Sequence, residues 1–167
     1  MPAQRSYTIT GKSLTIVANA TLVFINPKAS GSGSGFEVLR CWVSQNANAT
    51  SAQVQIQLHS QVSVFPTVVS ATPMPIDQMS NTASGIVGGT AGAAGTCGIN
   101  ASAEGAGAQT VIIVDNFNAL NGWLYVPVPE ERPRFGDAAT AVGFGMKIVG
   151  TPGTLTGWSW GVSYIEV

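Results

Sequence analysis

Between residues 54 and 64 the chain alternates between polar and apolar side chains, and this two-residue period most constrains the fold. The odd positions are all polar and include His59, whereas five of the six even positions are apolar, with Ser60 as the exception. Alternating side chains point to opposite faces of an extended strand, whereas an amphipathic helix needs apolar residues three and four positions apart. The segment is therefore predicted to be a half-buried antiparallel strand.

Further short segments with β-branched or alternating residues recur along the chain. They lie at residues 7–10, 14–17, 21–25, 36–44, 111–114, 123–126, 142–149 and 158–167. Gly, Pro and Asn turn signals separate many of these segments, and helix signals are weak. We expect one all-β domain over residues 1–167, an antiparallel β-sandwich, with a jelly roll as one form of it.

The alternation also predicts which side chains face the core in the segment 36–44. It places Leu39, Cys41 and Val43 on one face, with Val38, Arg40 and Trp42 on the other.

Residues 84–108 consist mostly of Gly and Ala and contain few large apolar side chains that could form a core. This composition predicts a long Gly/Ala-rich loop, and such loops are usually functional or disordered. Since Gly and Ala permit close backbone approach, we expect the loop to pack against a neighbouring subunit or flat over a sheet.

Charge is scarce in this chain. Only 9% of the 167 residues are charged, and no Lys or Arg lies between Arg40 and Arg132. Because binding to a nucleic-acid backbone requires several clustered cations, we expect no nucleic-acid partner. Hydroxyl and amide side chains far outnumber charged ones. Removing water from such a surface costs less free energy than removing it from a surface of charged side chains. The composition favours packing against other chains, and a neutral monomer is the alternative.

Membrane and export signals are not found in the sequence. No apolar run approaches the ~18 to 20 residues that span a bilayer, and residues 111–114 form the tightest one. Residues 1–12 lack the continuous apolar core of a signal peptide. We therefore expect no membrane partner and synthesis in the cytoplasm.

The residues that could support catalysis or metal binding are few. His59 is the only conventional general base, and no nucleophile motif accompanies it, so we expect it on a solvated strand face and predict no enzyme activity. Cys41 and Cys97, with a single His, make a poor metal set, and the amide-rich stretch after Asp115 lacks EF-hand spacing. We expect no metal or cofactor. The two cysteines are either buried as small hydrophobic residues or joined in a bridge.

Residues 130–137 hold five of the fifteen charges. One interpretation is a solvated loop with local ion pairs. The other is a docking loop in which Arg132, Arg134 and Phe135 contact a partner, because Arg and aromatic residues are enriched at interfaces.

Trp158 and Trp160 share one face of the last predicted strand, followed on that face by Val162 and Tyr164. Aromatic rows on sheets either fill the core of a sandwich or bind sugar rings. Core packing is the commoner fate of such a row, and both tryptophans are also candidate interface residues.

Residues 36–53, 86–108 and 157–167 together resemble a family of small, mostly uncharacterised virion proteins of tailed bacteriophages and prophages. The resemblance implies a capsid decoration (cement) protein that binds the major capsid protein and stabilises the head shell. It further implies a homo-oligomer on the virion capsid surface, with a trimer as one form, made in the host cytoplasm. Two alternatives are a tail- or fibre-associated module that binds glycans or a receptor, and a small jelly-roll shell protein.

Overall fold

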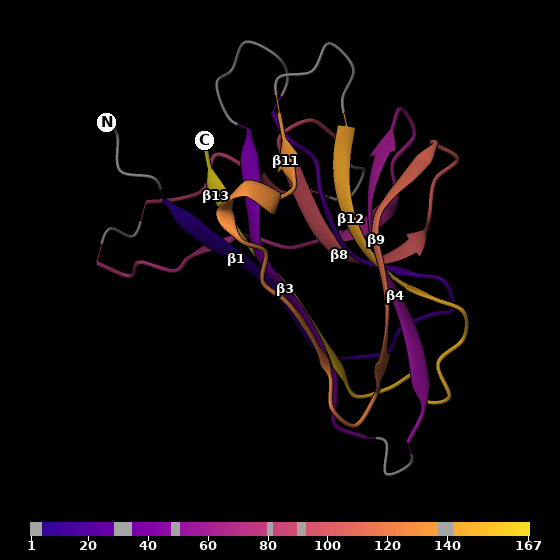
Figure 1. The fold of residues 1–167 in the computed structure, drawn as a ribbon. Helices are drawn as coiled ribbons and strands as arrows, with labels where there is room; N and C mark the ends of the chain where they lie inside the picture. The colour runs from indigo at the N-terminus through magenta and orange to yellow at the C-terminus, as the bar shows by residue number, and fades with distance from the viewer. Residues whose placement is uncertain (1–4, 29–34, 48–50, 80–81, 90–92, 137–141) are drawn as a thin grey trace.

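The computed structural model describes residues 5–28, 35–47, 51–79, 82–89, 93–136 and 142–167, with the backbone alone at residues 13 and 14. These residues form two β-sheets that pack face to face, so the expected all-β sandwich is confirmed (Figure 1). The elements, in chain order, are β1 (Ser6–Leu14), β2 (Thr21–Ile25), β3 (Phe36–Gln45), β4 (Gln53–Val62), β5 (Thr67–Ser70), β6 (Met74–Pro75), β7 (Val87–Gly88), β8 (Thr96–Ala103), β9 (Gln109–Asn118), β10 (Trp123–Tyr125), the 3₁₀ helix η1 (Pro129–Glu131), β11 (Arg134–Phe135), β12 (Val142–Val149) and β13 (Trp158–Glu166).

Eight of these strands pair as a jelly roll. β1 pairs with β13, β2 with β12, β3 with β10 and β4 with β9, all antiparallel. This is the pairing of one long hairpin folded over on itself. The two sheets have the orders β10-β3-β13-β1-β6 and β5-β8-β2-β12-β4-β9, which we call sheet A and sheet B. The jelly roll that the sequence suggested as one form is thus the topology observed.

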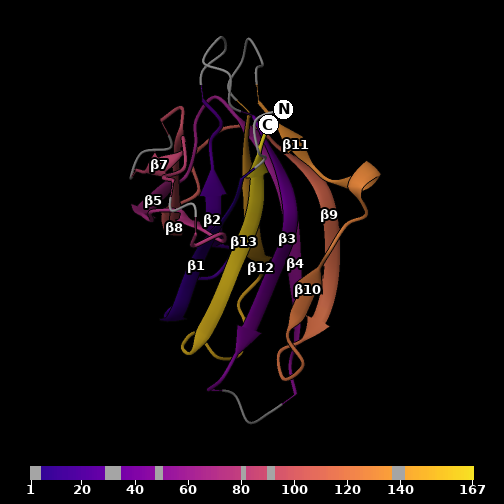
Figure 2. The ribbon, with the colours of Figure 1, turned by 90° about the vertical axis from the view of Figure 1, so that its left-hand side faces the viewer.

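The four strands β5 to β8 lie between β4 and β9 in the chain and form an insertion into the jelly roll. β8 and β5 extend sheet B beyond β2, and β6 extends sheet A beyond β1. Figure 2 shows this insertion on the opposite side of the sandwich from β9 and β10. One open side of the sandwich is therefore covered by the insertion, and the other ends at β9 and β10.

Large aromatic side chains of the sandwich lie over glycines of adjacent strands. Trp160 of β13 faces Gly11 of β1, where a Cβ atom would lie 2.7 Å from the indole. Phe24 lies over Gly143, and His59 over its cross-strand partner Gly145. Glycine inside a strand normally weakens it, but here each missing Cβ makes room for a ring.

A β-bulge changes the inward face of β3. The register against β13 shifts between Ser163 and Tyr164, which pair with Arg40 and Val38 and leave Leu39 without a partner position. Val38, Cys41 and Val43 are therefore buried, and the prediction that Leu39 rather than Val38 shares their face is wrong. The extra residue inverts the two-residue period, which no local pattern in this segment signals.

The expectation of a loop over residues 84–108 is also wrong for much of its length. β7 and β8 lie within it, and β8 pairs with β2 and β5 inside sheet B. Gly98 permits this because the Val68 side chain occupies the space where its Cβ would lie. Small residues here serve close packing within a sheet, while residues 90–92 lie outside the described ranges.

The outer face of sheet B is partly covered as well. Phe24 points away from the main core and packs in a second cluster with Val68, Ala101 and Phe65. All five residues of β2 are buried for this reason, since the main core covers one face and this cluster the other.

Candidate functional site

The two tryptophans predicted as interface residues lie in the core. Trp158 is 1% exposed and Trp160 is fully buried. Their indole N–H groups donate to the carbonyl oxygens of Thr154, at 2.7 Å, and Leu22, at 2.8 Å. Core packing is therefore the interpretation that the structure supports, and the interface prediction for both residues is wrong, because a buried ring presents no face to a sugar or a partner.

The predicted docking segment is held against β3. Arg134 and Arg132 both pair with the carboxylate of Glu37, at 3.0 Å and 3.8 Å. Phe135 is buried and stacks on Phe36 with ring centroids 5.3 Å apart. Of the three proposed contact residues, Arg134 alone has a largely exposed side chain, at 68%. The interpretation as a loop with local ion pairs therefore fits residues 130–136. Asp137 lies outside the residues that the structure describes.

His59 does not lie on a solvated face. The imidazole is fully buried over Gly145, and neither ring nitrogen has a hydrogen-bond partner of ordinary geometry among the described residues. Burial, with a smaller contribution from the charge of Lys147 and against an opposing effect of Gln61, lowers the pKa of His59 to about 4. A nucleophile–base pair needs a hydrogen bond to the base, so this histidine is not arranged for such chemistry here.

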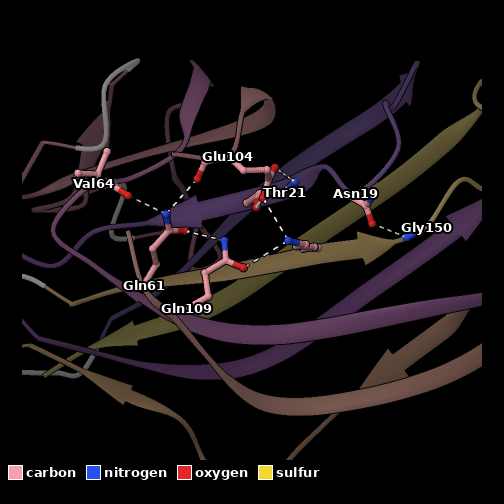
Figure 3. Close-up of polar contacts among 8 residues, drawn as sticks. Asn19, Thr21, Gln61, Val64, Glu104, Gln109 and Gly150 are labelled. Atoms are coloured by element: carbon pink, nitrogen blue, oxygen red, sulfur yellow. Dashed lines mark hydrogen bonds and ion pairs between the residues drawn. The ribbon is translucent and has the colours of Figure 1, made fainter. Parts of the chain in front are cut away.

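A polar network beside His59 fixes the segment before β9 onto sheet B (Figure 3). The Glu104 carboxylate accepts hydrogen bonds from the Thr21 backbone N–H at 2.6 Å and hydroxyl at 2.7 Å, and Lys147 lies 3.6 Å away. Lys147 also donates to Gln109, whose amide donates to Gln61. Because each member binds another chain segment, we interpret this network as structural.

Both cysteines are free and buried, so the bridge alternative is wrong. Burial raises the pKa of Cys97 to about 12 and raises that of Cys41 as well. Thiols of this kind behave as small hydrophobic residues and are poor nucleophiles or metal ligands.

Apolar side chains are exposed along the side of the sandwich where β9 and β10 end the two sheets. The Trp123 indole donates to the Asp115 carboxylate at 3.0 Å and ties these strands together. We call this region the β9–β10 surface; its exposed large apolar residues, between 41% and 65% exposed, are Val111, Ile112, Val114, Leu120, Leu124, Val126 and Val128.

A second group of exposed apolar side chains lies on the insertion, at the other end of both sheets. We call it the insertion surface; its members are Val69, Met74, Ile76, Met79 and Val87. Met79 is 98% exposed. Exposed apolar residues scattered singly need no explanation, but groups of them mark sites of interaction with proteins, ligands or membranes.

One feature of the sequence pointed to the β9–β10 surface, although it did not show that the strand is exposed. Residues 111–114 are four apolar residues in succession, whereas a half-buried strand alternates. Such a run fits a strand covered on both faces, but in the structure β9 is a poorly covered edge strand. The insertion surface had no comparable signal, because its members come from four short segments.

Among the described residues there is no group of three or more His, Cys, Asp or Glu side chains that could hold a metal ion. No helix in the described ranges is long and apolar enough to cross a membrane. Comparison of the chain with protein-family models, with curated proteins and with solved structures found no match. The class that the structure defines is the jelly-roll β-sandwich, and two apolar surfaces are its candidate functional sites.

Proposed function

We propose that this protein is a virion structural protein of a tailed bacteriophage, a decoration protein that binds the major capsid protein and stabilises the head shell. In this proposal it acts without catalysis or a cofactor and works as a homo-oligomer on the capsid surface. The virion context rests on the sequence resemblance. The jelly roll is compatible with it, because viral capsid and lectin domains share this fold, but a fold alone does not define a function.

The observation that carries the proposal is the presence of two apolar surfaces at opposite ends of the sheets. A decoration protein needs one contact with the shell and, as an oligomer, a second contact with its own copies. The β9–β10 surface and the insertion surface supply two such contacts. A protein that binds the intact mature shell, and not the disrupted shell, stabilises the intact shell by mass action.

The glycan-binding alternative has lost its candidate residues. Trp158 and Trp160 are buried and Trp123 is 9% exposed, so none of them offers a ring face for a sugar. The shell-protein alternative stays an outcome of the experiment below.

The test uses purified particles with and without this protein. Electron microscopy should locate it on the outside of the head, and particles that carry it should keep their genome at a higher temperature than particles that lack it. A position within the shell itself would favour the shell-protein alternative, and a position on the tail the receptor-binding one. Equal heat survival of the two kinds of particle would contradict the stabilising role.

A pair of variants then tests the insertion surface. Val87→Lys places a charge on that surface, whereas Ser44→Lys places one on an exposed position of β3. If the insertion surface contacts the shell, Val87→Lys should weaken binding to protein-free heads and Ser44→Lys should not. Equal binding by both variants would exclude the insertion surface as the shell contact.

A further inference from the structure

β9 is an unusually long strand for a sheet edge. It has ten residues and pairs with β4 alone among the described strands, so the backbone groups along its other side have no strand partner. The other strands that end the described sheets are β5, β6, β7, β10 and β11, with two to four residues each. β1 also has an open stretch, since it pairs with β6 at Tyr7 and Thr8 alone, but β9 is the longest strand that ends either described sheet.

Proteins usually protect long edges with charged side chains, proline, a covering segment or a bulge, because an unpaired edge is a template for another strand. β9 has one of these protections, a bulge at Ile112, where the register against β4 shifts. Residues 109–114 contain no charge and no proline. Val111, Ile112 and Val114 are all exposed, so apolar side chains accompany the open backbone edge.

We propose that β9 pairs antiparallel with β9 of a second copy of this chain, across a two-fold axis within residues 109–114. Sheet B of the two copies then forms one continuous sheet. The inference rests on the proposed function in that it names the partner of the β9–β10 surface as another copy, and so leaves the insertion surface for the shell.

Charge favours a second copy as the occupant. The formal net charge of the chain is −1, so two copies repel each other weakly. Asp115 is the single charged residue of β9, and its carboxylate already binds the Trp123 indole. With the axis near Ile112, the two Asp115 residues lie about 20 Å apart along the strands, given ~3.4 Å per residue. That separation exceeds the distance over which physiological salt screens charges.

The same axis pairs apolar residues with apolar residues. Around Ile112 the backbones of the two copies run past each other, each Ile112 faces its equivalent, and the exposed Val111 and Val114 of both copies lie along the shared edge. A two-fold contact brings the same surface together from both copies, so the apolar residues of β10 and the segment after it approach the interface from both sides. Pairing of β9 with itself therefore satisfies backbone and side chains together.

The first test measures association by sedimentation equilibrium over a range of concentrations. The wild-type chain should form a dimer. The double variant Val111→Lys/Ile112→Lys should raise the dimer dissociation constant about 100-fold or more, because like charges across an interface cost several kcal/mol. Both side chains are exposed, so circular dichroism and thermal unfolding should show an intact fold. Val69→Lys, the matched charge on the insertion surface, should leave the dissociation constant unchanged.

The second test detects the axis directly and does not depend on the lysine variants. Ile112→Cys should form an intermolecular disulfide under mild oxidation, whereas Val87→Cys on the insertion surface should not. Cys41 and Cys97 are buried and do not compete. A wild-type monomer at all concentrations, a trimer, or a dimer unaffected by the β9 lysines and without the Ile112→Cys cross-link would each overturn the inference.

These results separate the two proposals. If the β9 variant is monomeric yet still binds and stabilises heads, dimer formation is confirmed and is not needed for decoration. If β9 pairing fails the tests above while heads are still stabilised, the further inference is wrong and the proposed function stands. If the dimer forms and heads are not stabilised, the proposed function is wrong and β9 pairing stands.

Discussion

The indole of Trp42 lies across Gly161, its direct cross-strand partner on β13, in the space that a Cβ atom at Gly161 would occupy. The guanidinium carbon of Arg40 is 5.0 Å from the centroid of the same indole. The backbone of β13 is thus one wall of an aromatic site on the outer face of sheet A, and glycine is the residue that leaves room for it.

We expect Gly161→Ala to destabilise the protein by about 1–3 kcal/mol, because the added methyl group must displace a large ring from its site. Chemical denaturation measures this change. Gly153→Ala is the matched control, since no atom lies within 4 Å of the Cβ position at Gly153. If the ring is the cause, Gly161→Ala should cost much less in a Trp42→Ala background, and equal costs in both backgrounds would contradict the explanation.

The Glu104 carboxylate should be important for stability despite its surface position. Glu104→Ala leaves the buried Thr21 backbone N–H without its acceptor, and we expect a loss of about 1–3 kcal/mol. Hydrogen exchange should show faster exchange of the Thr21 amide. Glu130→Ala, on the exposed helix η1, should stay within about 0.5 kcal/mol. Unchanged protection of the Thr21 amide in Glu104→Ala would show that other contacts hold the segment.

His59 should make the folded state sensitive to acid. Its pKa in the folded state is about 4, below the ordinary value of 6.5. The unfolded chain therefore binds more protons between these values, and stability falls as the pH is lowered from about 6.5 towards 4, by about 3 kcal/mol in total. Above pH 6.5 the group has no effect. Denaturation at several pH values measures the slope.

The control for this prediction is His59→Gln, which removes the titrating group. Its stability should depend less steeply on pH than that of the wild type over the same window, whatever its stability at neutral pH. Parallel pH profiles for the two proteins would show that other groups cause the acid sensitivity.

Both native thiols should react with a thiol reagent only when the chain opens. Cys41 and Cys97 are buried and their pKa values are raised, so little thiolate is present or accessible in the folded state. The labelling rate should rise with denaturant in parallel with unfolding. Rapid labelling of either thiol in native buffer would mean that its surroundings open locally.

Several features of the fold could be predicted because they depend on neighbouring residues alone. The alternation in residues 54–64 predicted strand β4 with Ile56 and Leu58 buried, and the alternation in the last strand placed Trp158 and Trp160 on one face. In β3 the same reasoning failed at Val38 and Leu39, because the bulge that exchanges them is set by pairing with β13.

Prediction of the candidate site was less complete. Arg132, Arg134 and Phe135 were chosen for their residue types, but each of the three side chains contacts Glu37 or Phe36 within this chain. His59 was expected in solvent because it alternates with glutamines. It is buried, its ring lies against Gly145 of β12, and Glu104, more than 40 residues away, binds Gln61 of β4, the strand that holds His59. Neither outcome depends on residues nearby in the chain.

Strand character, the facing of side chains along regular strands and the scarcity of charge are all visible in the sequence. These follow from a two-residue period and from composition, which are local properties. Tertiary structure decided that the strands wrap as a jelly roll, that a Gly/Ala-rich segment supplies β8, and that β9 lies at an open edge. Those outcomes depend on pairing between distant segments, because whether a strand is covered is a property of its neighbours in space.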